Sequence, residues 1–208
     1  MQILLTSFVL VSSALHAATI QIASDLVNES NNRTDANVFI TPHPVWATAP
    51  AGAGWISYAN TGMGPGAVVA PSSTSEPRAI FTEQFFLPGT VNTGSVRVWA
   101  DDTASVQIDG VQIGPAANFL LDSACAAGSI GCEPLEFADI SLDGLSQGAH
   151  VLSFSVYQVG GSVFGLLYSG SALSISPIET TATPEPGTIF LLGGGLIGLA
   201  AVLRRRRR

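Results

Sequence analysis

The chain of 208 residues contains no lysine, and its eight basic residues are all arginines, of which five end the sequence. Between residues 18 and 183, only Arg33, Arg78 and Arg97 oppose fourteen acidic residues, so this part carries a net charge of −11. Because a surface of that sign repels phosphate backbones, we expect no nucleic-acid partner.

Residue patterns typical of catalysis are also scarce. The three histidines are His16, His43 and His150. His43 stands between prolines, which predicts a loop, and His150 opens a β-rich run, where a solvent-facing side chain is expected. We therefore expect neither an enzyme nor a cofactor. The alternative, a carbohydrate-active enzyme, requires two carboxylates that face each other across a cleft.

Only two cysteines are present, Cys125 and Cys132, in the segment Cys-Ala-Ala-Gly-Ser-Ile-Gly-Cys. In an exported chain such a pair is expected to form a disulfide. Closing so short a loop stabilises a fold by about 2–2.5 kcal/mol in the chain-entropy model. The alternatives are a zinc site, for which the sequence offers too few partners, and a catalytic cysteine, for which it offers no convincing histidine.

The N-terminus predicts a secretory signal peptide over residues 1–17. Ile3 to Leu15 is mostly apolar and too short to span a membrane, and small residues follow at Ala17 and Ala18. This combination is typical of a signal peptide that is cleaved near Ala17. A buried N-terminal strand is the alternative.

The C-terminus has three parts in a fixed order. The triplet Pro184, Glu185 and Pro186 precedes an uncharged run of 17 residues, 187–203. As a helix this run is about 26 Å long, close to the roughly 30 Å of a hydrocarbon core. The chain ends in a basic cluster: Arg204, Arg205, Arg206, Arg207 and Arg208. Arginines beside a span stay in the cytoplasm, so the preceding residues are expected outside it.

This terminal block resembles the PEP-CTERM sorting signal of Gram-negative bacteria. The resemblance implies an exosortase-type membrane protease as partner, transient anchoring in the inner membrane by the span 187–203, and removal of the tail. It also implies delivery to the cell surface or an extracellular matrix. A permanent single-pass anchor is the alternative.

Residues 18–177 read as strands without helices. The β-rich runs are separated by turn-forming and proline-rich stretches: 19–23, 37–41, 55–58, 78–87, 95–100, 105–113, 136–142, 150–159 and 164–175. This spacing predicts an all-β sandwich. Residues 178–183 predict an extended linker to the sorting signal at 184–208.

The clearest local pattern is a hairpin centred on Asp109-Gly110. The dipeptide lies between two alternating runs whose apolar residues are Val106, Ile108, Val111 and Ile113. Asp-Gly readily adopts the positive φ angles of a type I′ turn.

The stretch 99–110, WADDTASVQIDG, resembles the central strand and hairpin of galactose-binding-like jelly rolls, and 145–156 and 164–166 resemble their later strands. The resemblance implies a jelly-roll-like β-sandwich and a polysaccharide partner. The aromatic candidates for stacking on a sugar are Trp46, Trp55 and Tyr58, and core packing is their alternative role. Asp101 and Asp102 are candidate ligands of a structural calcium ion, and capping of a turn is the alternative.

Together these patterns predict a non-catalytic, exported surface or matrix protein that binds exopolysaccharide. The main alternative is a structural biofilm or coat component without a small ligand. An exposed aromatic group beside polar residues in a concavity would favour the first hypothesis.

Overall fold

The computed structural model of the chain describes residues 15–65, 68–122, 124–177 and 204–205. Its described residues up to 177 form strands, turns and bends, with no helix among them. The predicted linker, the Pro184–Pro186 triplet, the span 187–203, Arg206 to Arg208 and most of the signal peptide lie outside the described residues. Arg204 and Arg205 are described and exposed.

The described residues form eleven strands, and each β-rich run of the sequence overlaps at least one of them. The strands are β1 (Leu15–Ala23), β2 (Glu29–Asn31), β3 (Val38–Phe39), β4 (Ile56–Ser57), β5 (Ala79–Leu87), β6 (Thr90–Asp101), β7 (Thr103–Ile108), β8 (Val111–Gln112), β9 (Ala138–Ser141), β10 (Gly148–Tyr157) and β11 (Gly165–Pro177). The predicted cleavage point near Ala17 falls within β1.

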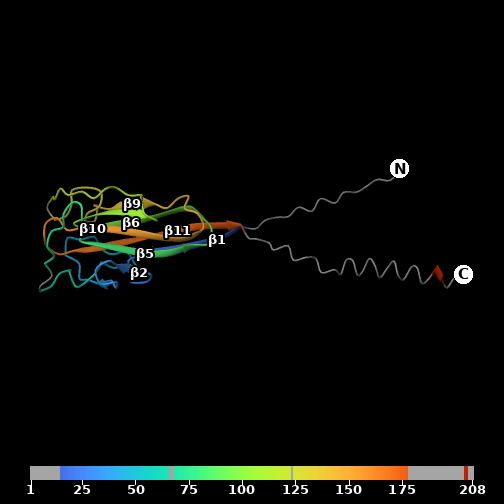
Figure 1. Cartoon of the computed structure of the whole chain (residues 1–208), viewed down its shortest axis with the longest axis horizontal. Coiled ribbons are helices and arrows are strands. Elements are labelled where there is room, and N and C mark those ends of the chain that lie inside the picture. Colours follow the sequence, from blue (N-terminus) through green and yellow to red (C-terminus); the bar gives the residue numbers. More distant parts are fainter. Residues whose placement is uncertain (1–14, 66–67, 123, 178–203, 206–208) are drawn as a thin grey trace. The chain divides into compact units, whose positions relative to one another are not determined.

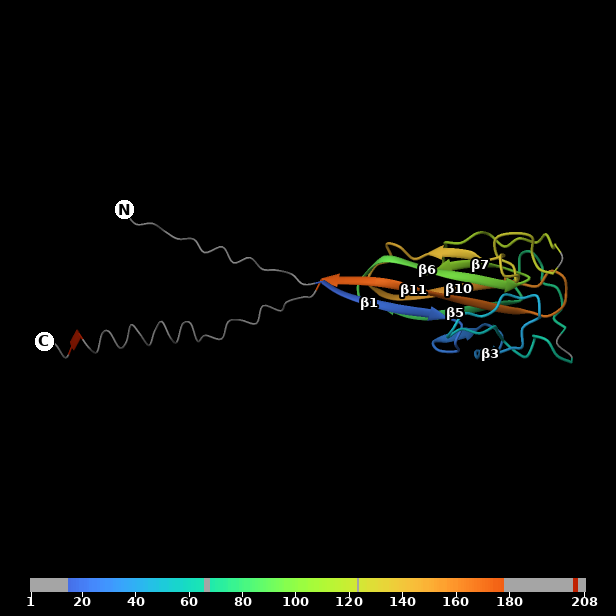
Figure 2. The same cartoon turned by 180° about the vertical axis from the view of Figure 1, so that it is seen from behind.

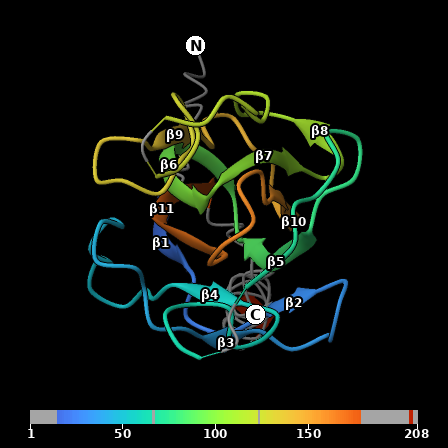
Figure 3. The ribbon, with the colours of Figure 1, turned by 90° about the vertical axis from the view of Figure 1, so that its left-hand side faces the viewer.

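Two antiparallel sheets pack face to face (Figure 1, Figure 3). One has the order β3-β4-β11-β6-β9, with β1 also paired to β11, and the other has the order β2-β5-β10-β7-β8. The predicted all-β sandwich is confirmed. β1 begins and β11 ends at one end of the sandwich, and the loops that join β6 to β7 and β10 to β11 lie at the other (Figure 2). We call the latter the loop end.

The main core lies between the sheets and follows the two-residue period of the strands. In β5, β10 and β7, the buried residues Phe81, Phe154 and Val106 lie in one row across the sheet. Phe154 stacks on Tyr168 of the facing sheet, with ring centroids 4.4 Å apart. Burying each such aromatic side chain contributes about 1.5–3 kcal/mol.

A second apolar cluster covers the outer face of the β6/β11 sheet. In β6, Val98 and Ala100 point into the main core, whereas Trp99 between them points outward, beside its pairing partner Leu167 of β11. Trp46 and Trp55 pack over this face together with Cys125 and Cys132. We call Trp46, Trp55, Trp99, Leu167 and the two cysteines the tryptophan cluster. It explains why β6 is buried on both faces near its end.

Cys125 and Cys132 form a disulfide, as expected from the sequence, and their Cα atoms are 5.7 Å apart. Both cysteines are fully buried. The amide of Ala47 donates to the carbonyl of Cys132 at 2.7 Å, so the disulfide loop and the segment carrying Trp46 are joined directly.

The predicted hairpin is present. Asp109 and Gly110 both have positive φ angles, 50° and 80°, as a type I′ turn requires. Of its apolar residues, Val106 and Ile108 are buried, but Val111 is 64% exposed. Val111 belongs to β8, a two-residue strand at the edge of its sheet.

Candidate functional site

A cavity of about 560 Å³ lies in the segment from Phe39 to Trp55. Its lining is mainly apolar and includes the rings of Phe39, His43, Trp46 and Trp55. We call it the aromatic cavity.

The local sequence keeps this segment irregular and anchors it through its tryptophans. Pro42, Pro44 and Pro50 prevent a continuous strand. Trp46 donates its amide hydrogen to the carbonyl of His43 at 3.0 Å, and the indole Nε1 of Trp55 donates to the carbonyl of Ala47 at 2.9 Å. The two indole rings lie 4.3 Å apart. The cavity floor is thus held by buried hydrogen bonds.

The structure brings together two of the three aromatic candidates. Trp46 and Trp55 are 5% and 2% exposed, so they have the core-packing role that was the alternative to sugar stacking. They are buried because they cover the outer face of Trp99 and Leu167. Tyr58 lies elsewhere, half-buried against Phe164 of the main core.

The exposed ring at the cavity is Phe39, which the sequence analysis missed. Phe39 is 54% exposed, and its ring rests on Gly54, where any Cβ would come within 2.6 Å of it. The only sequence signal that could have indicated Phe39 is an aromatic residue in a short β-rich run just before the proline-rich segment.

A smaller cavity of about 240 Å³ shares His43 and Trp46 with the aromatic cavity. It is also lined by Asp101, at the end of β6, and by Ser162. The Oδ2 atom of Asp101 accepts a hydrogen bond from Nε1 of Trp46 at 2.9 Å, whereas its Oδ1 atom is buried without a partner. A buried polar atom without a partner is costly, so a hydrogen-bond donor at this oxygen would be stabilising.

Burial, and then the neighbouring Asp102 carboxylate, raise the pKa of Asp101 to about 8, against the effect of the Trp46 hydrogen bond. Burial also raises the pKa of Asp102, although the amides of Val159 and Gly160 donate to its Oδ2 atom at 2.5 and 2.8 Å.

Calcium requires six to eight oxygen ligands. Among the described residues, the side-chain group able to hold a metal combines Asp101 with Cys125 and Cys132, and its sulfur atoms do not suit calcium. The assignment of calcium to Asp101 and Asp102 therefore stays a prediction.

A second pair of acids, Glu29 and Glu83, faces across β2 and β5. The hydroxyl of Tyr168 donates to Oε1 of Glu29, and Asn37 donates to its Oε2 atom at 3.0 Å. Burial raises the pKa of Glu83 to about 8. Because Glu83 points from β5 into the main core, this pair lacks the open cleft that glycoside hydrolysis requires.

Residues 182–208 match the PEP-CTERM protein-sorting motif. The chain therefore carries the sorting signal of an exported protein. Within the residues described, no helix is long and apolar enough to cross a membrane.

No curated protein matches the sequence. Among solved structures, a family 35 carbohydrate binding module from Clostridium thermocellum superposes with a TM-score of 0.40 and 9% identity, covering 73% of this chain and 97% of the module. The catalytic domain of a GH87 alpha-1,3-glucanase in complex with tetrasaccharides gives a TM-score of 0.34 and 13% identity, covering 84% of this chain and 31% of that chain. Values this low assign neither a fold family nor a ligand.

Proposed function

We propose that this chain, exported under its PEP-CTERM motif, is a non-catalytic surface or matrix protein that binds a neutral exopolysaccharide at the aromatic cavity. The observation that carries the proposal is the exposed ring of Phe39 beside a buried carboxyl group with a free oxygen, in adjoining cavities.

The two chemical faces of a sugar fit these cavities. A pyranose ring presents apolar C–H groups, which pack on an aromatic face, and hydroxyl groups, which need hydrogen-bond partners. Phe39 supplies the aromatic face, while Asp101 and Ser162 supply polar groups. A mostly apolar cavity with a few convergent polar groups is the usual form of a small-ligand site.

The charge of the lining favours an uncharged glycan. No arginine is among the described residues that line the two cavities, and the acid Asp101 lines the smaller one. The surrounding chain from 18 to 183 has a net charge of −11. Uronate, sulfate or phosphate groups would therefore be repelled.

The domain organisation suits a displayed binding module. The cavity that adjoins the aromatic cavity is lined by Asp101 and Ser162, next to the loops of the loop end. β11 ends at the opposite end of the sandwich (Figure 2). Residues 1–17 act as signal peptide, 18–177 as the β-sandwich domain, 178–183 as linker and 184–208 as sorting signal. An exosortase-type protease removes the tail after residues 187–203 have held the chain in the inner membrane.

Binding is tested by titrating the purified full-length protein with neutral polysaccharides and with polyuronates, following tryptophan fluorescence. The Phe39→Ala variant should lose about tenfold in affinity for the neutral glycan, equivalent to about 1.4 kcal/mol. Phe86→Ala is the matched control, because Phe86 is 59% exposed on the other sheet.

The same titration with calcium and with a chelator tests the calcium prediction. Binding that needs calcium would place the ion in the glycan site. Absence of binding to every neutral glycan would contradict the proposal and leave a structural coat component as the role.

A further inference from the structure

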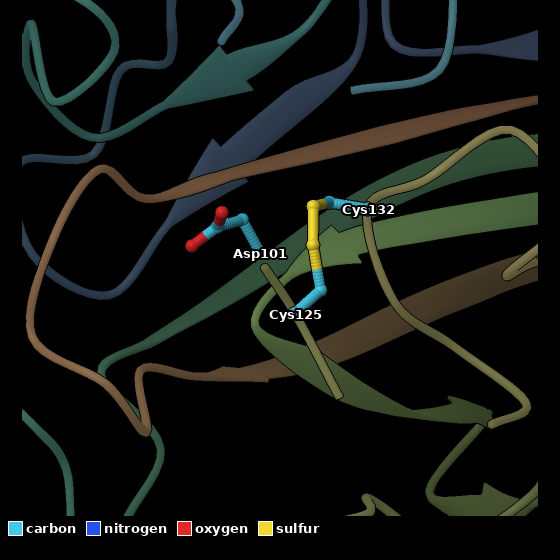
Figure 4. A group of neighbouring side chains, drawn as sticks. All are labelled: Asp101, Cys125 and Cys132. Carbon is cyan, nitrogen blue, oxygen red and sulfur yellow. A yellow bond between two sulfur atoms is a disulfide. The ribbon is translucent and has the colours of Figure 1, made fainter. Parts of the chain in front are cut away.

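Asp101, Cys125 and Cys132 form a compact group of metal-binding atoms in the tryptophan cluster. One carboxylate oxygen and the two sulfur atoms all lie within 4.8 Å of one another, and all three residues are buried. Figure 4 shows Asp101 next to the disulfide, with its two carboxyl oxygens directed away from the sulfur atoms in this view. The sequence alternative of a zinc site lacked a third partner, and Asp101, distant from the cysteines in sequence, supplies one.

We propose that the dithiol form of this chain binds one thiophilic divalent cation, such as Zn²⁺, through Asp101, Cys125 and Cys132, and that the disulfide form does not. The site is gated by the redox state of the cysteines. The inference does not depend on glycan binding.

The gating step is a two-electron reduction. A reductant such as a dithiol or a phosphine breaks the Cys125–Cys132 bond and is itself oxidised, while two electrons and two protons convert the disulfide to two thiols. Metal binding then releases both thiol protons, because thiolates are the ligands. Oxidation of the pair reverses the sequence and expels the metal.

Two features of the group favour metal binding by the reduced site over two thiols without a metal. The Oδ1 atom of Asp101 is buried without a partner, so a metal would supply the interaction that it lacks. Its Oδ2 atom is held by Nε1 of Trp46 at 2.9 Å, which orients the carboxylate as outer hydrogen-bond partners do in metal sites.

The ligand set selects the ion. Two thiolates and one carboxylate suit Zn²⁺, with Zn–S distances of about 2.3 Å, and disfavour Ca²⁺ and Mg²⁺. The smaller cavity, which Asp101 lines together with His43 and Ser162, provides room for water or an exogenous ligand as the fourth partner.

The test uses the purified full-length protein, oxidised or reduced with a phosphine, and titrates it with Cd²⁺ as a spectroscopic substitute for Zn²⁺. The reduced protein should bind one ion per chain and show thiolate-to-cadmium charge transfer, and the oxidised protein should bind none. Equal binding by the two forms, or none by either, would overturn the proposal.

Variants separate the ligands. Asp101→Asn should weaken cadmium binding by at least about tenfold, and Cys125→Ser with Cys132→Ser should abolish it. Asp139→Asn is the control, because Asp139 is an exposed acid paired with Arg97. Wild-type affinity in Asp101→Asn would remove the carboxylate from the site.

X-ray absorption of the zinc-loaded wild type does not depend on the folding of any variant. It should show two sulfur ligands and at least one oxygen or nitrogen ligand. A spectrum with four sulfur ligands, as in a site shared between chains, or with none would contradict the assignment.

Discussion

The imidazole of His150 is buried against Phe85 and donates from Nδ1 to Oδ2 of Asp109 at 2.7 Å. Its Nε2 atom donates to the carbonyl of Ser146 at 2.9 Å. Both partners are acceptors, so only the protonated imidazolium form of His150 donates both hydrogen bonds at once. The expectation of a solvent-facing His150 is wrong, because the ring ties the Asp109-Gly110 turn to β10.

This contact predicts a pH dependence of stability. The hydrogen bonds to Asp109 and Ser146 raise the pKa of His150 despite its burial. Protonated His150 should therefore contribute fully to the free energy of unfolding below the ordinary histidine pKa of about 6.5. This contribution should be lost as the pH rises through the raised pKa of the folded state. A double-mutant cycle with His150→Gln and Asp109→Asn should give a coupling of about 1 kcal/mol at pH 6 in urea unfolding, since Asp109 is half-exposed. Equal coupling at pH 6 and pH 9 would refute the charged pair.

The burial of Glu83 leads to a second predicted pH dependence of folding stability. Because its pKa is raised to about 8 in the folded state, folding takes up a proton between pH 4.5 and 8, and stability falls as pH rises through this window. In the Glu83→Gln variant, stability should decrease less as the pH rises, and above pH 8 the variant should be more stable than wild type. The midpoints of urea unfolding measure both effects. A variant with the wild-type slope would show that Glu83 is ionised at neutral pH.

Trp46 should prove to be a core residue. Trp46→Ala removes a buried ring and leaves Oδ2 of Asp101 without its donor, so it should lower the free energy of unfolding by about 3–5 kcal/mol. Leu135→Ala, at an 89% exposed position, is the control and should change little. If the Trp46→Ala variant is as stable as wild type, the ring is a surface group and the prediction is contradicted.

The sorting tail should be removed in a host that contains an exosortase. Replacing Pro184, Glu185 and Pro186 by alanines permits a helix where the prolines hold an extended segment. The variant should accumulate as a full-length, membrane-bound form, detected by mass spectrometry of its C-terminus. Replacing Thr180 and Thr181 by alanines is the control. Retention of Arg204 to Arg208 in mature wild type would indicate a permanent anchor.

The strands could be predicted from the sequence because their signals are local. Alternation in β6 and the Asp-Gly turn depend on neighbouring residues, and both hold in the structure. β2 was missed because Glu29, Ser30 and Asn31 are polar and pair only at a sheet edge.

The candidate site could not be predicted in the same way, because it is formed by contacts between segments that are distant in the sequence. Asp101 meets Trp46 across 55 residues, and no spacing rule links them. Sequence reasoning named Trp46 and Trp55 as stacking candidates and kept core packing as the alternative. It could not choose between the two roles, because the outward-facing Trp99 and Leu167 that they cover cannot be recognised without the sheet pairing.

Glycan binding at the aromatic cavity is tested most directly by the indole N–H signals of the three tryptophans in an NMR titration with a neutral oligosaccharide. Trp46 and Trp55 line the cavity, and Trp99 does not. The signals of Trp46 and Trp55 should shift in a saturable manner while that of Trp99 stays in place. Saturable binding that leaves both Trp46 and Trp55 unchanged would contradict the proposed site.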